Sequence, residues 1–392
     1  MMDLLWILLT TLSLSHLVKS ELLTPQTNSS VTTVTLLEKY GYPVETHEVT
    51  TEDGYILVIH RIPNPGSAIA FIVTGLSASS SDAVILGDNS LGEILFNAGF
   101  DVWIGNSRGN DYSNRNINFS NQSPQFWNFS FNEIGVYDFP AMINYISDNT
   151  GIQQVRFFGH SQGTTAYLVL TSLMPEWNDR FIAAHLLAPV AFMSHLTNKF
   201  INLISPVAGQ PNALKELIGS MKLKPSKETL LVLSTLLCPP SRPDRILCEN
   251  SLFLTTGFNE DTVDNDFIPD IMATTPSSAS TNQYLHYVQE FNSGYFRKYD
   301  YGPRNLLEYG SLTPPSYDLN NVKGPIFMYF GEADEFVART DLDILIEKLP
   351  NSTVAGVYVV PVANFDHLAF LYTKNIREKV YNKVMEDVAS TQ

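Results

Sequence analysis

The chain has few charged residues and, among them, few basic ones. Of its 392 residues, 24 are Lys or Arg and 40 are Asp or Glu, giving a formal net charge of −16. Proteins that bind nucleic acid neutralise phosphates with clustered Lys and Arg, and the sequence has no such cluster. It also lacks a P-loop, a G-x-G-x-x-G turn, a zincin signature and internal repeats. We therefore expect no nucleic-acid partner, no metal and no cofactor.

Long hydrophobic runs are also scarce. The longest, residues 4–18, lies at the start of the chain. At its end, Val18-Lys19-Ser20 offers small or modest residues at the positions where a leader is cleaved. This pattern predicts a signal peptide, residues 1–20, although Asp3 and the lack of Lys or Arg before the run are untypical. An uncleaved anchor is the alternative, but a spanning helix needs ~20 apolar residues. We expect a chain that enters the secretory route, without a transmembrane anchor after cleavage.

Two further features agree with the secretory route. Asn28, Asn118 and Asn351 each begin an Asn-x-Ser/Thr sequon, the acceptor for glycosylation in secreted proteins. The two cysteines of the chain, Cys238 and Cys248, lie close together beside a Pro-Pro turn. In an oxidising compartment an even count at short spacing favours a disulfide. Two free thiols are the alternative.

The clearest motif is Gly-His-Ser-Gln-Gly at residues 159–163. Residues 154–158 are expected to form a buried strand before it, and residues 162–173 have the small and apolar composition of a helix. Strand, sharp turn and helix are the context of a G-x-S-x-G nucleophile elbow, which exposes the hydroxyl of Ser161. The pattern also occurs by chance in loops, and the flanking elements favour the elbow.

A serine nucleophile needs a histidine to take its proton and an acid to orient that histidine, in the chain order serine, acid, histidine for this type of elbow. Of the eight histidines, only His367 follows a further unit of strand plus acid. Residues 325–330 are expected to form that strand, and Asp334 follows it, with Glu332 and Glu335 as competitors. We predict Asp334 and His367 as the partners of Ser161.

An oxyanion formed at Ser161 requires two backbone donors. In an elbow of this kind, one is the N–H of the next residue, Gln162, and the other comes from the loop after an early strand. Residues 68–73 are expected to form that strand, and Thr74-Gly75-Leu76 opens the loop. We therefore predict the N–H groups of Leu76 and Gln162 as the oxyanion hole. Gly75 could also be an ordinary turn glycine.

Several blocks outside the elbow resemble the acid lipase family, the relatives of gastric and lysosomal acid lipases. They include Gly-Asn-Ser-Arg-Gly-Asn at 105–110, and the others lie at residues 40–43, 51–57, 61–63, 98–103, 126–130, 137–141 and 187–190. The resemblance extends from about Val34 to Val388 and implies hydrolysis of triacylglycerols, cholesteryl esters or other neutral lipid esters. The family's catalytic residues fall on Ser161, Asp334 and His367, and cysteines spaced like Cys238 and Cys248 are a family trait.

Three departures from the family pattern concern efficiency and substrate preference. The family usually has His where this chain has Thr74, Trp where it has Glu335, and Pro-x-Gly-Thr-Ser where it has residues 276–280. None removes a predicted catalytic side chain. We therefore expect the family's reaction type with altered preference or rate.

The resemblance implies an α/β fold of the α/β-hydrolase type, with a mostly parallel sheet flanked by helices. Alternating strands and helices enclose an irregular insert, so we expect core segments at 21–190 and 318–392 and a mainly helical cap or lid at 191–317. The leading hypothesis is a secreted or lysosomal serine lipase acting at a lipid–water interface. A short-chain carboxylesterase and a non-catalytic lipid- or protein-binding relative are the alternatives.

Overall fold

The computed structural model describes residues 30–198, 201–202, 205, 221–222 and 263–391. The predicted signal peptide, Asn28, Cys238 and Cys248 lie outside these residues. Within the described residues, no helix combines the length and the apolar character needed to cross a membrane.

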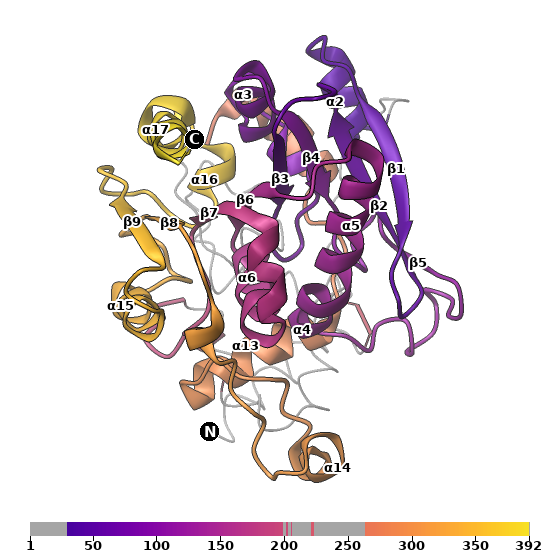
Figure 1. Cartoon of the computed structure of the whole chain (residues 1–392), viewed down its shortest axis with the longest axis vertical. Helices are drawn as coiled ribbons and strands as arrows, with labels where there is room; N and C mark the ends of the chain where they lie inside the picture. Colours follow the sequence, from indigo (N-terminus) through magenta and orange to yellow (C-terminus); the bar gives the residue numbers. More distant parts are fainter. Residues whose placement is uncertain (1–29, 199–200, 203–204, 206–220, 223–262, 392) are drawn as a thin grey trace, which may run out of the picture.

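A twisted central sheet organises the chain (Figure 1). Its strands run in the order β1-β2-β4-β3-β6-β7-β8-β9, with β5 paired to β2. The pairs β1–β2, β2–β4 and β2–β5 are antiparallel, and every neighbour from β4 to β9 is parallel. The bounds are β1 Glu45–Thr50, β2 Tyr55–Ile62, β3 Ile69–Val73, β4 Asp101–Gly105, β5 Arg115–Asn116, β6 Val155–His160, β7 Phe181–Leu187, β8 Ile326–Phe330 and β9 Val354–Val359. The prediction of a mostly parallel sheet is confirmed.

The composition of each strand follows its place in the sheet. The central strands β3, β4, β6 and β8 are buried at every position, because helices cover both faces of a parallel sheet. The edge strand β1 alternates between half-buried and exposed residues instead. The predicted strands at 68–73, 154–158, 325–330 and 354–361 agree with β3, β6, β8 and β9 to within one or two residues.

Helices flank the sheet and connect its parallel strands. The α-helices of the core are α2 Thr33–Lys39, α3 Leu91–Asn97, α4 Phe131–Glu133, α5 Phe139–Thr150, α6 Gln162–Leu173, α15 Arg339–Lys348, α16 Ala369–Tyr372 and α17 Asn382–Ser390. The helix predicted over 162–173 is α6, which is buried from Gln162 to Ser172. A helix buried on all sides is apolar or small throughout rather than amphipathic, which explains its composition.

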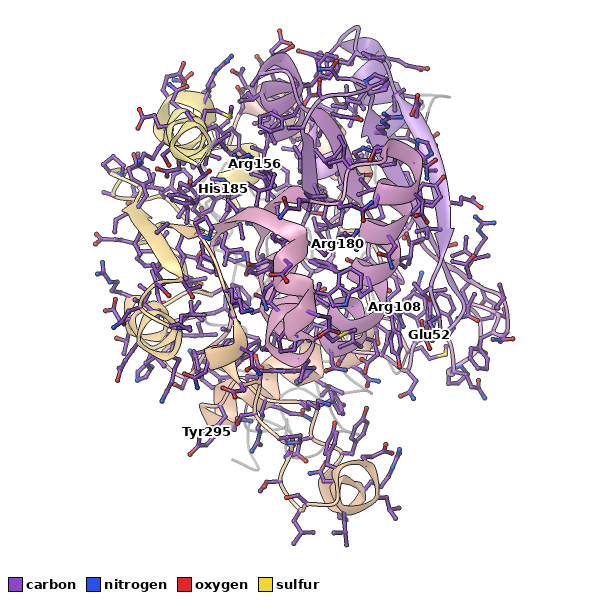
Figure 2. The ribbon with its side chains drawn as sticks, in the orientation of Figure 1. Glu52, Arg108, Arg156, Arg180, His185 and Tyr295 are labelled. Carbon is purple, nitrogen blue, oxygen red and sulfur yellow. The ribbon has the colours of Figure 1, made fainter. Side chains whose placement is uncertain are left out.

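His185 lies in the core, as its apolar sequence context predicts. It belongs to β7 and is labelled in Figure 2. The side chain is fully buried, and its ring stacks against Phe158 and Phe327. Its Nδ1 lies 3.0 Å from the hydroxyl of Tyr329. Burial lowers the pKa of His185 to about 3, so the ring is neutral at physiological pH. His185 is therefore part of the packing of the sheet.

The described part of the chain between β7 and β8 is mainly helical. It contains α12 Ile268–Thr274, α13 Thr281–Ser293 and α14 Asn305–Tyr309, and Figure 1 labels α13 and α14 toward the lower end of the view. Helix α13 begins at a capping box, in which the Ser280 side chain accepts from the N–H of Asn282 and the Gln283 side chain accepts from the N–H of Ser280. It ends at Gly294, whose φ of 73° suits a glycine C-cap.

Candidate active site

Ser161 lies on a sharp turn between β6 and α6. Its backbone has φ 52° and ψ −119°, a strained conformation for a non-glycine residue. A Cβ atom at Gly163 would lie 2.2 Å from the carbonyl oxygen of Val73 on β3, and one at Gly159 would lie 2.7 Å from the ring of Phe157. The two glycines therefore leave the space that this turn needs.

The structure brings Ser161, His367 and Asp334 into one hydrogen-bonded chain. The Oγ of Ser161 lies 2.8 Å from Nε2 of His367, and Nδ1 of His367 lies 2.8 Å from Oδ2 of Asp334. Because a carboxylate oxygen accepts, Nδ1 of His367 carries the hydrogen and Nε2 is left to accept from the Ser161 hydroxyl. Asp334 and His367 are both buried. This arrangement can activate the Ser161 hydroxyl as a nucleophile.

Asp334 is fixed by its own loop. Its Oδ1 accepts hydrogen bonds from the N–H groups of Phe336 at 2.8 Å and Val337 at 3.0 Å. The loop follows the carboxyl end of β8, and His367 follows the carboxyl end of β9. In an open α/β sheet these ends meet at one edge, which explains how residues distant in sequence come together.

His160 supports the backbone of His367 from the elbow. Its Nε2 lies 2.9 Å from the carbonyl oxygen of His367, so Nε2 carries the hydrogen and donates it. Burial, reinforced by the neighbouring His367, lowers the pKa of His160 to about 3 and keeps the ring neutral. The sequence pattern predicts no role for His160 beyond its place inside the elbow.

The competing acids lie in other environments. Glu332 is exposed, and Oε2 of Glu335 accepts a hydrogen bond from the side-chain amide of Asn198 at 3.3 Å. Asp366, the neighbour of His367 in the sequence, is not the solvated charge that its place in a loop suggests. It is buried, and its Oδ1 accepts from the N–H groups of Leu368 and Ala369 at 3.0 and 2.8 Å. Asp366 thus caps the turn that leads into α16.

The predicted oxyanion loop passes directly over Ser161. A Cβ atom at Gly75 would lie 2.9 Å from Cβ of Ser161, so only glycine permits this approach. Leu76 follows in the loop and Gln162 is the first residue of α6. Among the hydrogen bonds of the described residues, none uses the N–H of Leu76 or Gln162. Both N–H groups can therefore serve an incoming oxyanion.

Thr74 holds this loop from within. Its hydroxyl is buried and donates to the carbonyl oxygen of Ser79 at 3.0 Å. The bond closes the turn that contains Gly75 and Leu76. Thr74 thus provides one brace of the loop at the position where the family usually has His.

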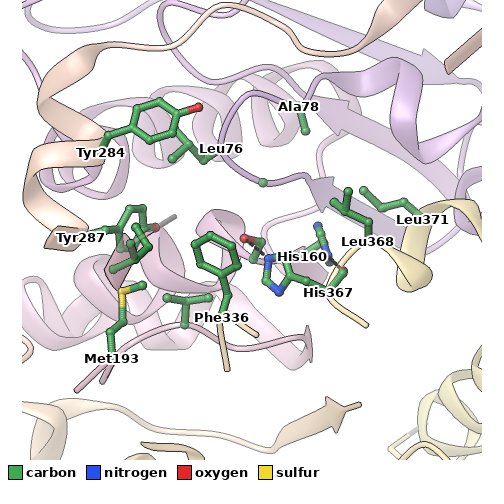
Figure 3. Close-up of a pocket in the computed structure, with 14 residues that line it drawn as sticks. Leu76, Ala78, His160, Met193, Tyr284, Tyr287, Phe336, His367, Leu368 and Leu371 are labelled. Carbon is green, nitrogen blue, oxygen red and sulfur yellow. Dashed lines mark hydrogen bonds between the residues drawn. The ribbon is translucent and has the colours of Figure 1, made fainter. Parts of the chain in front are cut away.

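The triad opens into an apolar cavity (Figure 3). Its walls come from the oxyanion loop, the loops after β7, β8 and β9, and helix α13, and they include Leu76, Met193, Tyr284, Tyr287, Phe336 and Leu371. None of the site residues predicted from the sequence lies on α13. No local signal marks Tyr284 and Tyr287 as wall residues, because their position depends on how the insert folds back on the core.

In the part of the chain that the structure describes, the site has no set of ligands suited to a metal ion. Among the described residues, no group of three or more His, Cys, Asp or Glu side chains is placed to hold an ion. The polar groups at the cavity belong to Ser161, His160, His367 and the tyrosines of α13. These groups have the chemistry that a nucleophile, a base and hydrogen-bond donors for acyl transfer require.

The chain is similar to known proteins over most of its length. The family described as alpha/beta hydrolase fold matches residues 71–373, and the partial alpha/beta-hydrolase lipase region matches residues 33–86. Lipase 3 of Drosophila melanogaster is 43% identical over 363 residues, which cover 90% of this chain and 92% of that protein. Gastric triacylglycerol lipase of Homo sapiens is 34% identical over 366 residues, which cover 90% of each protein.

Solved structures agree on the fold. The chain is similar to a carboxylesterase structure from Nitrososphaera gargenis, with a TM-score of 0.52 and 10% identity over 88% of this chain and 98% of that one. At such low identity the likeness concerns the fold alone. Together with the sheet order and the extended similarity to named lipases, it leads to one conclusion: the chain belongs to the acid lipase family of the α/β-hydrolase fold.

Proposed function

We propose that the protein is a serine lipase that hydrolyses neutral lipid esters through an acyl-enzyme intermediate. Ser161 is the nucleophile, His367 the general base and acid, and Asp334 the residue that orients His367. The observation that carries the proposal is the hydrogen-bonded chain of these three side chains, 2.8 Å at each step, at the base of an apolar cavity.

In the proposed mechanism, the Ser161 oxygen attacks the ester carbonyl carbon while its proton passes to Nε2 of His367. The carbonyl oxygen becomes an oxyanion that accepts from the N–H groups of Leu76 and Gln162. The C–O bond to the alcohol then breaks, and His367 returns its proton to the leaving alcohol. Water repeats the sequence on the acyl-enzyme, which releases the fatty acid and restores Ser161.

The proposed substrates are triacylglycerols or cholesteryl esters presented at a lipid–water interface. The apolar walls of the cavity suit an acyl chain, because they offer it side chains such as Leu76, Met193 and Phe336 instead of water. The similarity to gastric triacylglycerol lipases supports the same substrate class. Residues 191–317 are proposed to form the cap over this cavity, to which α13 contributes Tyr284 and Tyr287.

We further propose that the protein follows the secretory route to the extracellular space or the lysosomal lumen. The leader pattern at residues 1–20 and the similarity to gastric lipases support this compartment. Asn118 and Asn351 are exposed and accessible to glycosylation. A Cys238–Cys248 disulfide is proposed for the same compartment. Mass spectrometry of a non-reduced digest should contain the linked peptides, and freely alkylated cysteines would contradict the bond.

The central experiment compares two substrates in the wild type and the Ser161→Ala variant. A soluble short-chain ester and an emulsified long-chain triglyceride are offered at equal ester concentration, and fatty-acid release is titrated. We expect the wild type to hydrolyse the emulsion and Ser161→Ala to hydrolyse neither substrate while remaining folded. Hydrolysis of the soluble ester alone would favour a carboxylesterase. Failure of the wild type on both, with Ser161 inert to an organophosphonate, would favour a binding role.

A further inference from the structure

Helix α13 of the insert makes direct contact with both halves of the predicted oxyanion hole. Two consecutive residues on this helix, Gln283 and Tyr284, reach the elbow and the oxyanion loop respectively. Tyr287, one turn further along, contacts α6. Residues three and four positions apart share a helix face, and Tyr287 has these spacings from Tyr284 and Gln283, so this face is directed at the catalytic core.

The first contact fixes the side chain of Gln162. Its Oε1 accepts a hydrogen bond of 2.7 Å from Nε2 of Gln283, and both side chains are buried. The orientation of Gln283 is unambiguous, because its Oε1 accepts from the backbone N–H of Ser280 at 2.7 Å and a backbone N–H can only donate. The amide of Gln283 therefore has its NH₂ group directed at Gln162.

The second contact fixes the opposite half. The hydroxyls of Tyr284 and Ser77 lie 2.6 Å apart in a buried position, and Ser77 is the residue after Leu76. Ser77 has a φ of 57°, a left-handed conformation that costs free energy in a non-glycine residue and needs support. Its carbonyl oxygen also accepts from the N–H of Ser277, in the insert, at 2.8 Å. The insert thus holds Ser77 through both its side chain and its backbone.

Helix α13 is itself anchored to the core. The hydroxyl of Ser280, at its N-terminus, donates to the carbonyl oxygen of Trp127 at 2.6 Å. The hydroxyl of Tyr287 donates to Oγ1 of Thr165 at 3.0 Å, and Thr165 donates in turn to the carbonyl oxygen of Val190. These bonds give α13 a defined position relative to α6, from which Gln283 and Tyr284 can position other groups.

We propose that Gln283 and Tyr284 are positioning residues that aim the two oxyanion donors, Gln283 through Gln162 and Tyr284 through Ser77. The proposal rests on the proposed function, because it assigns these residues to the same reaction. It also explains how Thr74 can stand where the family usually has His, since the oxyanion loop is braced from the insert as well as from within. Substrate then has to enter the cavity while α13 stays in place.

The test uses the full-length protein, a soluble ester and steady-state kinetics. Gln283→Met removes both hydrogen bonds of the amide, and Tyr284→Phe removes the hydroxyl while keeping the ring in the cavity wall. Removing one oxyanion donor costs roughly 10²–10³ in kcat, and a misaimed donor loses part of that factor. We expect kcat to fall about tenfold for each variant with KM within about twofold, because the contact matters in the transition state.

Two variants in the insert serve as matched controls. Gln289 lies on α13 and also makes two amide hydrogen bonds, to the N–H and carbonyl oxygen of Asp300 at 2.8 and 2.9 Å, away from the site. Tyr309 donates its hydroxyl to the carbonyl oxygen of Tyr299 at 2.9 Å. Gln289→Met and Tyr309→Phe should keep kcat within about twofold of the wild type. An equal loss in the controls would overturn the proposal, because general loosening of the insert would explain all four results.

A second readout separates positioning from folding. An organophosphonate forms a bond to Ser161 while its oxygen occupies the oxyanion hole, so its rate of reaction should fall in parallel with kcat in Gln283→Met and Tyr284→Phe. The double variant Gln162→Met/Gln283→Met should lose no more than either single variant, because the two side chains act through one bond. Wild-type phosphonylation rates, or additive losses in the double variant, would overturn the assignment.

The outcomes distinguish this proposal from the proposed function. Undiminished hydrolysis by Ser161→Ala would contradict the serine mechanism itself. A dead Ser161→Ala together with wild-type kcat in both Gln283→Met and Tyr284→Phe would contradict the positioning roles alone. If Gln283→Met fails to fold because α13 loses its capping box, Tyr284→Phe decides the question, since that variant retains every ring contact.

Discussion

Two His–Asp pairs among the described residues have nearly equal geometry and very different surroundings. In one, Nδ1 of His367 lies 2.8 Å from Asp334, and in the other, Nδ1 of His195 lies 2.7 Å from Asp341. Both acids are buried. The His367 side chain is 3% exposed, whereas the His195 side chain is 49% exposed. The distance between histidine and acid therefore does not distinguish the two pairs.

The surroundings of the two histidines distinguish the two pairs. Nε2 of His367 faces the hydroxyl of Ser161, inside an apolar cavity. At the other pair, Asp341 also accepts from the backbone N–H of His195 at 2.9 Å, so it holds the start of the insert against α15. A His–Asp pair becomes a base only where it has a proton to take and a place for the substrate. Without these two features, the pair only links two segments of the fold.

The largest difference between the pairs should come from replacing the histidines. Removing the base of a triad typically costs on the order of 10⁴–10⁶ in kcat, so His367→Ala should be as inactive as Ser161→Ala. His195→Ala should keep kcat within about threefold, because its ring is not at the cavity. Steady-state rates on a soluble ester measure both. A dead His195→Ala with a native fold would show that this pair takes part in turnover.

Replacing the two acids should give the same contrast between the pairs, with a smaller effect on kcat. Asp334→Asn should lose on the order of 10⁴ in kcat, because the amide cannot hold the tautomer of His367 that leaves Nε2 free to accept. Asp341→Asn should keep its activity and lose about 1–2 kcal/mol of unfolding free energy through its weakened bonds to His195. Kinetics and denaturant titration separate the two effects. Near-normal rates in Asp334→Asn combined with loss in Glu332→Gln would move the acid to Glu332.

Glu93 on α3 extends the comparison to a buried acid without a histidine. Neither of its carboxylate oxygens has a hydrogen-bond partner among the described residues, and burial, together with nearby Asp88, raises its pKa well above 4.5. The folded state thus binds the proton more tightly than the unfolded state. The contribution of this protonation to the free energy of unfolding is therefore fully present below about pH 4.5. It is lost as the pH rises toward the pKa of Glu93 in the folded state.

Glu93→Gln removes this dependence because an amide does not ionise. The variant should therefore melt at a higher temperature than the wild type at pH 7, and the difference in melting temperature should be smaller at pH 4. Thermal unfolding at both values, in buffers of equal ionic strength, measures the difference. An equal shift at pH 4 and pH 7 would mean that Glu93 does not titrate with folding. Asp334→Asn, at the site, serves as a comparison with a hydrogen-bonded acid.

The smallest effect is expected at Thr74. The loop is already held by the bond from Thr74 to Ser79 and by the contact between Ser77 and Tyr284. Thr74→His should therefore change kcat by no more than about threefold, with any change toward a faster enzyme, because only part of one donor's contribution is at stake. Thr74→Val, which loses the hydroxyl alone, should be slower. A tenfold gain in Thr74→His would mean that the loop limits the wild-type rate.

The sequence predicted the elements that depend on local patterns. Short apolar strands between turn residues, and the helix at 162–173, follow from side-chain periodicity and composition, and the structure has them within one or two residues. The fold class and family are confirmed as well. The chain order of serine, acid and histidine pointed to Ser161, Asp334 and His367, which the structure brings within hydrogen-bonding distance. Their catalytic roles stay predictions.

Local sequence patterns did not predict which core residues the insert contacts. Gln283 meets Gln162 across 121 residues, and Tyr284 meets Ser77 across 207. His195 pairs with Asp341 across 146 residues, although its sequence context is only an irregular segment after a core strand. Asp366 lies in a loop, where a carboxylate is usually solvated, yet the fold buries it and its Oδ1 accepts from the N–H groups of Leu368 and Ala369.

The sequence by itself therefore determined the strands, the elbow and the order of the candidate catalytic residues, because a nucleophile turn is built from neighbours and glycine is required where backbones meet. Only the tertiary structure brought the predicted acid and histidine to Ser161 and decided which side chains of the insert contact Gln162 and Ser77. These contacts depend on where the insert packs against the core. That position is set by the burial of whole apolar faces of helices and sheet, and no short stretch of residues encodes it.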